Sequence, residues 1–268
     1  MVKVSIVGCG TIGSAIAESL ESSFSDKVEL TALCDVDKRQ ADKLAEKLKK
    51  SPRILSLDAL IEVSDLVVEA ASGDVAAEVV RKCLESGKDV MVISIGGLIG
   101  QAHLFELAEK SKGHLYLPSG ALCGIDAVRA VRETEIEMVE LITRKPLEGL
   151  RGAPYFKEKG IDIDKIDKET VVFEGSAAEA IKGFPKNVNV SALLSIAGVG
   201  PEKTMVKIVT SPAYKRNSHQ IIVEGAFGRL EARTDNVPSP QNPKTSYLAI
   251  LSCISTLKQI FSRVKIGG

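Results

Sequence analysis

The sequence is poor in aromatic residues and has no excess of charge of either sign. It contains no tryptophan, and aromatic residues make up only 4% of its 268 residues. Thirty-five basic residues balance 35 acidic ones, and the signs alternate along the chain. A basic surface for nucleic acid or for an anionic membrane is therefore not predicted. We expect the partner to be a small molecule.

Long apolar runs and paired cysteines are also missing. No stretch reaches the roughly 18 apolar residues that a membrane span requires, and the N-terminus lacks the apolar core and cleavage site of a signal peptide. The five cysteines are scattered, without a Cys-x-x-Cys pair that would suggest zinc or a redox motif. These absences predict a cytoplasmic protein without a metal site, whose cysteines are small apolar residues in a reducing compartment.

The first part of the chain alternates short β-branched runs with amphipathic helical stretches. Strands are expected at Val4–Val7, Glu29–Cys34, Leu66–Glu69, Asp89–Ile93 and His114–Leu117. Helices are expected at Ile12–Glu21, Lys38–Lys49, Val75–Ser86 and Gln101–Lys112. Repeated βαβ units of this kind form a parallel sheet. Residues 1–118 are therefore predicted to fold as an α/β, doubly wound domain.

The alternation stops after Pro118, and longer strands follow. They are expected at Ile136–Thr143, Thr204–Thr210 and Gln220–Thr234, the last broken by a turn around Gly225–Gly228. Residues 119–243 are predicted to form a second, α+β domain with an antiparallel or mixed sheet. A final helix at Lys244–Ser262 is expected to pack back on the first domain. The segment Arg151–Gly175 has alternating charge, and we interpret it as a solvated face.

A glycine-rich loop, Gly8-Cys9-Gly10-Thr11-Ile12-Gly13, follows the first predicted strand and opens the first helix. In a G-x-G-x-x-G loop the first glycine allows a tight turn, the second lets a pyrophosphate approach the backbone, and the third lets the helix pack closely on the strand. The helix N-terminus adds free N–H donors and a positive dipole. The alternative is a glycine-rich turn without a ligand. The place of the loop within a βαβ unit predicts instead a Rossmann domain that binds a dinucleotide.

Further cofactor contacts are expected after the second and fourth strands. Asp35 stands where a carboxylate accepts hydrogen bonds from the adenosine ribose hydroxyls, so NAD is the first expectation. Lys38 and Arg39 could instead hold the 2′-phosphate of NADP, and both cofactors stay open. Small residues after the fourth strand leave room for the dinucleotide to cross the sheet, or form a plain turn: Ala70, Ala71 and Ser72.

The second domain holds the candidates for chemistry. Hydride transfer belongs to the cofactor, so the protein must position the substrate and manage protons. His219 stands at the entrance to a strand, where an imidazole can act as acid or base; an ordinary loop histidine is the alternative. His103 and His114 are interpreted as structural. Asn187 and Asn189 precede an apolar helix, Ser191–Ala197, where an amide can cap the helix or hold a carboxamide.

Together these segments resemble the L-aspartate dehydrogenase family of archaea and bacteria. The resemblance covers essentially the whole chain. It rests on GCGTIG at Gly8–Gly13, PSGALCGIDA at Pro118–Ala127, TRKP at Thr143–Pro146, FPKNVNVSA at Phe184–Ala192, RNSH at Arg216–His219 and NPKTSYLA at Asn242–Ala249.

The resemblance implies an NAD(P)-dependent oxidoreductase that converts L-aspartate to iminoaspartate, or to oxaloacetate and ammonia, and so feeds NAD biosynthesis. It also implies a homodimer, with residues 119–243 serving substrate binding and dimerisation. His219 falls on the family's active-site histidine. Ala121 and Asn189 fall on its cofactor-contacting positions, and Asn187 is kept as a second choice.

Three cationic residues are candidates for binding the substrate. Two substrate carboxylates need cationic or N–H partners, and Lys186, Arg216 and Lys244 lie in the matching motifs, although each alone could be a surface charge.

A homoserine dehydrogenase or a dihydrodipicolinate reductase also joins a Rossmann half to an α+β half, but the paired histidines usual in the latter are absent. A regulator that senses NAD(H) without turnover should carry a DNA-binding or docking segment, and the sequence has none.

Overall fold

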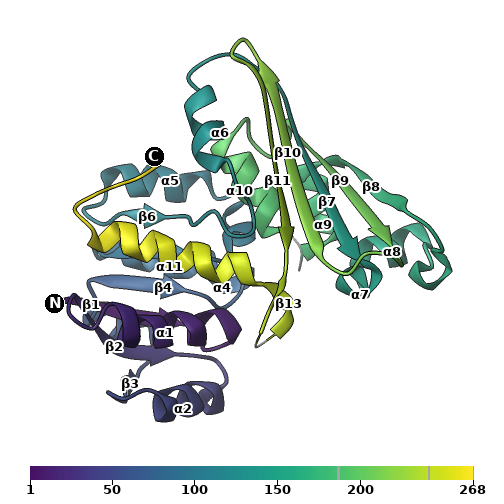
Figure 1. Cartoon of the computed structure of the whole chain (residues 1–268). Coiled ribbons are helices and arrows are strands. Elements are labelled where there is room, and N and C mark those ends of the chain that lie inside the picture. Colours follow the sequence, from purple (N-terminus) through teal and green to yellow (C-terminus); the bar gives the residue numbers. More distant parts are fainter. Residues whose placement is uncertain (186–187, 241, 268) are drawn as a thin grey trace. The chain divides into compact units, whose positions relative to one another are not determined.

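The chain folds into two compact units. The computed structural model describes residues 1–185, 188–240 and 242–267. The first unit comprises Met1–Pro118 and Ile250–Lys265, and Ser119–Ala249 make up most of the second. Each unit has its own sheet (Figure 1) and its own hydrophobic core. In the part of the chain that is described, no helix is long and apolar enough to cross a membrane.

The first unit is built on a six-stranded parallel sheet with the order β3-β2-β1-β4-β5-β6. Its strands are β1 (Val2–Val7), β2 (Val28–Cys34), β3 (Arg53–Ile54), β4 (Leu66–Glu69), β5 (Asp89–Val92) and β6 (Leu115–Tyr116). Its helices are α1 (Thr11–Ser23), α2 (Lys38–Lys47), α3 (Leu57–Glu62), α4 (Gly73–Glu85), the 3-10 helix η1 (Ile95–Leu98), α5 (Ala102–Lys110) and α11 (Tyr247–Phe261). The strand order reverses between β1 and β4, as it does in Rossmann folds. The predicted doubly wound α/β fold is confirmed.

Helices cover both faces of this sheet, which explains why its strands are nearly continuous apolar runs. On one face, Ile16 and Leu20 of α1 and Leu257 of α11 share a core with Val4 and Ile6 of β1. Figure 1 shows α11, in yellow, beside α1 on that face. On the other face α4 packs against the central strands, burying Val79, Val80 and Cys83. The loops to these helices begin at the carboxyl ends of the strands, which is where open α/β sheets bind their ligands.

The second unit contains a five-stranded sheet with the order β11-β10-β7-β9-β8. Its strands are β7 (Ile136–Pro146), β8 (Thr170–Ser176), β9 (Thr204–Ser211), β10 (Asn217–Gly225) and β11 (Gly228–Asn236), and a hairpin of β12 (Pro238–Ser239) and β13 (Asn242–Ser246) follows. Its helices are α6 (Ile125–Val131), α7 (Leu147–Leu150), α8 (Pro154–Lys159), the 3-10 helix η2 (Ile163–Lys165), α9 (Ala177–Gly183) and α10 (Asn189–Ala197). Because β7 and β9 are parallel while the other neighbours are antiparallel, the sheet is mixed. The α+β prediction is confirmed in its mixed form.

Strand register places a row of side chains on the inner face of this sheet. Thr143 of β7 pairs with His219 of β10 and with Ile208 of β9. Side chains two residues apart on a strand share a face, so Leu141 and Lys145 lie on the same side as Thr143. This face packs against α9 and α10, which contribute Ala180 and Leu194, among others, to the core of the second unit.

One sequence expectation is incomplete and one is wrong. The charged side chains of Arg151–Gly175 are exposed, as expected of a solvated face, but the segment also contains α8, η2 and most of β8, and it buries Phe156, Ile163, Val172 and Phe173 in the core. These apolar residues stand singly or in pairs between charges, so the alternating charge conceals them. The final helix does not begin at Lys244 but at Tyr247, after β13. Proline favours an extended conformation in the residue before it, and Asn242-Pro243 begins that strand.

Candidate active site

The glycine loop joins β1 to α1 in a conformation that depends on its glycines. Gly8 has φ +97°, and a Cβ there would lie 2.5 Å from backbone atoms of Ala70 and Ala71. A Cβ at Gly13 would lie 1.9 Å from the carbonyl oxygen of Gly8. At Gly10 a Cβ would meet no heavy atom of the described residues within 4 Å. The first and third glycines are thus required by packing, and the second leaves space above the N-terminus of α1.

This space suits the phosphates of a dinucleotide. Gly10 is the N-cap of α1 and has no side-chain cap, and the first N–H groups of a helix have no partner within it. Thr11 and Ile12 follow as half-buried residues of the first turn. A helix N-terminus with an open backbone above it favours an anionic ligand through its N–H donors and its dipole. The residues present therefore fit the dinucleotide that the motif predicts.

Asp35 ties the glycine loop to the end of β2. Its carboxylate accepts hydrogen bonds from the backbone N–H of Cys9, at 2.6 Å, and of Asp37, at 2.8 Å. An ionised carboxylate has about four acceptor positions, so these two bonds leave capacity for ribose hydroxyls. Arg39 forms an ion pair with Asp37 at 3.1 Å, and Lys38 is exposed. Asp35 consequently has a structural role in the loop as well as its expected role with the ribose.

Glu69, which the sequence analysis missed, organises the loop after β4. The side chain is fully buried and accepts hydrogen bonds from the backbone N–H of Ala71, at 2.8 Å, and of Ser94, at 3.0 Å. Burial raises the pKa of this carboxyl, and the N–H donors act in the opposite direction. Ala71 and Ser72 are exposed, and Ala70 is half-buried. The predicted small-residue loop is thus exposed, and the buried carboxyl of Glu69 holds its backbone in place.

His219 lies on the inner face of the second unit, near the start of β10. It is 4% exposed, and its Nδ1 lies 3.1 Å from the hydroxyl oxygen of Thr143. Burial, and then the charge of Lys145, lower the pKa of His219 to about 3. The imidazole is therefore neutral at physiological pH, with one ring nitrogen as donor and the other as acceptor.

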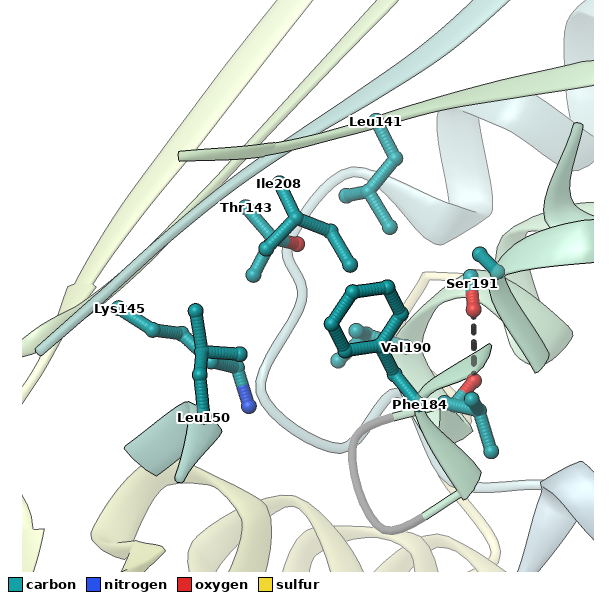
Figure 2. Close-up of a pocket in the computed structure, with 10 residues that line it drawn as sticks. Leu141, Thr143, Lys145, Leu150, Phe184, Val190, Ser191 and Ile208 are labelled. Carbon is teal, nitrogen blue, oxygen red and sulfur yellow. Dashed lines mark hydrogen bonds between the residues drawn. The ribbon is translucent and has the colours of Figure 1, made fainter. Parts of the chain in front are cut away.

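Lys145 and Thr143 are further polar residues of this face that the sequence analysis missed. Lys145 is only 9% exposed, and burial lowers its pKa to about 8. Figure 2 shows Thr143 and Lys145 projecting from β7 toward a small cavity of about 10 Å³ that Phe184 and Ser191 also line. Both residues belong to the TRKP motif. The period-2 alternation of a strand would have placed them on one face, but only the fold shows that this face is buried.

The other predicted residues lie in different surroundings. The carbonyl oxygen of Ala121, a buried residue, accepts hydrogen bonds from Thr234 Oγ1 at 2.8 Å and Asn236 Nδ2 at 3.2 Å. Asn189 is the exposed first residue of α10, whose N-cap is Val188, so Asn189 is not the cap. Arg216 is exposed in the loop before β10.

The remaining predicted positions lie outside the described residues or away from this site. Lys186 and Asn187 lie outside the described residues, as does the side chain of Lys244. His103 is exposed on α5, and Nδ1 of His114 lies 3.0 Å from a carboxylate oxygen of Asp89. The described residues contain no group of three or more His, Cys, Asp or Glu side chains that could hold a metal ion.

Known structures resemble this architecture. The crystal structure of aspartate dehydrogenase from Thermotoga maritima matches with a TM-score of 0.71 and 25% identity, over 100% of both chains. A myo-inositol dehydrogenase from Lactobacillus casei, solved with NAD(H) and myo-inositol, matches with a TM-score of 0.55 and 14% identity, over 97% of this chain and 85% of that one. The second similarity extends to the fold alone.

Family models and curated relatives cover the two units. Residues 8–118 match the NAD-binding domain of homoserine dehydrogenase, and residues 126–260 match the C-terminal domain of aspartate dehydrogenase. L-aspartate dehydrogenase of Methanosarcina mazei is 48% identical over the full length of both chains. That of Bradyrhizobium diazoefficiens is 39% identical over 99% of this chain and 94% of its own. The chain is an oxidoreductase with a pyridine-nucleotide-binding domain, and it belongs to the L-aspartate dehydrogenase family.

Proposed function

We propose that this chain transfers a hydride from Cα of L-aspartate to the nicotinamide of NAD or NADP and so forms iminoaspartate. The iminoaspartate either leaves for NAD biosynthesis or takes up water and loses ammonia as oxaloacetate. The observation that carries the proposal is the buried pair of Thr143 and His219, 3.1 Å apart, in the unit that matches aspartate dehydrogenases. The pair offers a neutral, oriented imidazole for chemistry at a substrate carbon.

The first unit would hold the cofactor at the carboxyl edge of its sheet. Gly8, Gly10 and Gly13 shape the phosphate site, with Thr11 and Ile12 in the first turn of α1. Asp35 would accept hydrogen bonds from the ribose, and the loop Ala70–Ser72 would lie along the dinucleotide. NAD is the preferred cofactor in this proposal because the Asp35 carboxylate repels a 2′-phosphate, and because Arg39 is already paired with Asp37. When bound, the nicotinamide supplies the hydride acceptor.

His219 would manage protons in the hydrolytic branch. A neutral imidazole can take a proton from the water that attacks the imine carbon, and can return it to the nitrogen that leaves as ammonia. The imidazole of His219 then ends the reaction in the protonation state in which it began. Ala121 and Asn189 would contact the cofactor, with Asn187 as the second choice. Arg216, Lys186 and Lys244 are the proposed partners of the substrate carboxylates.

The assembly and location are part of the same proposal. The family resemblance supports a homodimer, which light scattering of the purified protein would test. The five cysteines are free thiols, as expected of a protein in a reducing compartment, and this supports a cytoplasmic location.

A spectrophotometric assay tests the activity. Purified protein would be given NAD or NADP with L-aspartate, D-aspartate, L-homoserine and a panel of other amino acids. Reduction of the cofactor with L-aspartate, and ammonia-dependent oxidation of NADH with oxaloacetate, are expected. Turnover of L-homoserine in place of L-aspartate, or binding of NADH without turnover of any substrate, would refute the proposal.

A further inference from the structure

The buried lysine of the second unit is in an unusual place. Lysine side chains are rarely buried to this extent, and Lys145 is 9% exposed. It follows Thr143 by two residues on the same strand and the same face, and Thr143 is hydrogen-bonded to His219. One short stretch of β7 therefore supplies an amine and the hydroxyl that contacts the predicted active-site imidazole.

The cavity beside Lys145 limits what can reach it. Its volume of about 10 Å³ is about enough for a single water molecule. The hydroxyl of Thr143 also lines it, and that of Ser191 donates to the carbonyl oxygen of Val188 at 2.9 Å (Figure 2). Such a cavity does not admit a whole dicarboxylic acid, but it allows one small polar group, or one water, to meet the amine.

The helices and strands packed around Lys145 present mainly apolar side chains to it. Leu150 of α7, Ala180 of α9, Val190 of α10 and Ile208 of β9 are apolar lining residues. Among the titratable side chains of the described residues, His219 of β10 interacts with Lys145: burial, and then the charge of Lys145, lower the pKa of His219. The side chains of Glu148 on α7 and Glu179 on α9 are instead engaged with Arg151 and Ser176.

We propose that Lys145 is a further catalytic residue, the amine that accepts the proton which the substrate ammonium must lose before hydride transfer. This inference rests on the function proposed above. Removal from water lowers the pKa of Lys145 to about 8, so a useful fraction of the amine is neutral near physiological pH. His219, with its pKa at about 3, stays neutral while Lys145 changes charge.

The neutral amine of Lys145 takes one proton from the ammonium of L-aspartate, directly or through the single water. The nitrogen lone pair then forms the C=N bond while the Cα–H bond breaks, and the hydrogen leaves with the bonding electron pair as a hydride, which a bound oxidised nicotinamide would accept. The products are the iminium form of iminoaspartate, the reduced nicotinamide and protonated Lys145, which releases its proton to solvent.

Three variants test the role by steady-state kinetics across pH. In the wild-type protein, kcat for L-aspartate oxidation should rise with pH to a plateau above about 8. Lys145→Met should lower kcat by roughly 10²–10⁴-fold and abolish that rise, while NADH binds with unchanged affinity. Lys145→Arg should be equally impaired, because a guanidinium cannot become neutral. Lys182→Met is the matched control: Lys182 is an exposed lysine on α9, and its loss should leave the profile unchanged.

The outcomes separate this inference from the function on which it rests. A wild-type protein that does not oxidise L-aspartate overturns the proposed function and the role of Lys145 with it. An active wild-type protein whose Lys145→Met variant keeps the same pH profile overturns the role of Lys145 alone. A raised KM with an unchanged profile, retained activity in Lys145→Arg, or both, would mean that the lysine binds a carboxylate instead. Thermal melting of each variant establishes that it folds.

Discussion

The hydroxyl oxygen of Thr143 lies 3.1 Å from Nδ1 of His219, and strand register makes these residues direct neighbours on β7 and β10. The backbone of two central strands thus fixes the position of both groups. Whichever of the two donates the hydrogen, the bond selects one tautomer of the neutral imidazole and leaves Nε2 with the complementary role. Orientation of the ring is therefore set by the sheet and not by a mobile loop.

Thr143→Val should reduce turnover with L-aspartate while leaving NADH affinity unchanged. Valine keeps the branched shape but cannot bond to the imidazole. A net hydrogen bond is worth about 1 kcal/mol, so a loss of about fivefold to tenfold in kcat is expected. Thr143→Ser, which keeps the hydroxyl, is the control for packing. Equal kcat in the valine variant and the wild-type protein would show that the bond does not orient the ring during turnover.

His219→Ala should lose most formation of oxaloacetate and ammonia from L-aspartate but keep its affinity for NADH. Groups that manage protons contribute on the order of 10²–10⁴-fold. His219→Asn retains polarity and approximate size but cannot exchange a proton in this range, so it should be similarly impaired. Near-normal turnover in the asparagine variant would reduce the imidazole to a positioning group. Oxidation of NADH with oxaloacetate and ammonia should fall in proportion.

Folding stability should depend on pH in two windows. His219 has a pKa of about 3 in the folded chain and about 6.5 when unfolded, so the unfolded chain binds more protons between these values. Stability is then lost as the pH falls from about 6.5 toward 3. Lys145 has a pKa of about 8 when folded and about 10.4 when unfolded. Burial of the charged amine lowers the free energy of unfolding most below pH 8. Stability is regained as the pH rises above 8 and the amine loses its proton.

Lys145→Met should therefore stabilise the protein at pH 7. One pKa unit corresponds to about 1.4 kcal/mol, so removing the buried amine should raise the free energy of unfolding by up to about 3 kcal/mol. The gain should shrink as the pH approaches 10. Urea denaturation at pH 7 and pH 10 measures both values. A variant less stable than the wild-type protein at pH 7 would contradict the prediction.

Asp35→Ser should weaken both cofactors, and NAD more than NADP. The carboxylate supports the glycine loop through the N–H of Cys9, at 2.6 Å, so its loss affects either ligand. Only NAD also loses the expected ribose bonds, while NADP is relieved of charge repulsion. Asp35→Asn keeps an acceptor for Cys9 and should preserve the loop better. Fluorescence titration with NADH and NADPH compares the variants, and equal losses in Asp35→Ser would show that the carboxylate does not contact the ribose.

Gly10→Ala and Gly13→Ala form a matched pair. At Gly13 the new Cβ would lie 1.9 Å from the carbonyl oxygen of Gly8, so the helix must move and both stability and cofactor binding should fall. At Gly10, where φ is −72°, the Cβ fits the fold but occupies the space expected for the pyrophosphate. Gly10→Ala should keep its melting temperature and lose affinity for NADH. Wild-type affinity for NADH in both variants would show that the glycine loop does not bind the cofactor.

The glycine loop and the strands around it were predictable because their signals are local. Gly8, Gly10 and Gly13 occur at fixed spacing after an apolar strand. Gly8 and Gly13 each avoid a clash with a few backbone atoms, and Gly10 leaves space above the N-terminus of α1. The first four predicted strands of the first unit match the structure to within two residues at each end. The short strand β3 and helix α3 escaped because they contain two and six residues, too few for a period to be evident.

The chemistry of the second unit was less accessible from sequence. His219 was predicted from its position and from a family resemblance, but its low pKa depends on its burial and on the charge of Lys145. Lys145 looks like an ordinary charged residue in the sequence. Its importance arises only when Leu141, Thr143 and Lys145 are seen to share a buried face, which depends on segments distant in the chain. Glu69 was missed for the same reason.

Helix α11 has a consequence for the order of synthesis. It supplies Cys253 and Leu257 to the core around β1 and α1, although the last strand of that sheet ends at Tyr116. More than a hundred residues are translated between the two, which takes on the order of 10 s on a ribosome. During that interval one face of the nascent Rossmann sheet lacks its final cover. The first unit is thus completed only after most of the second has been translated.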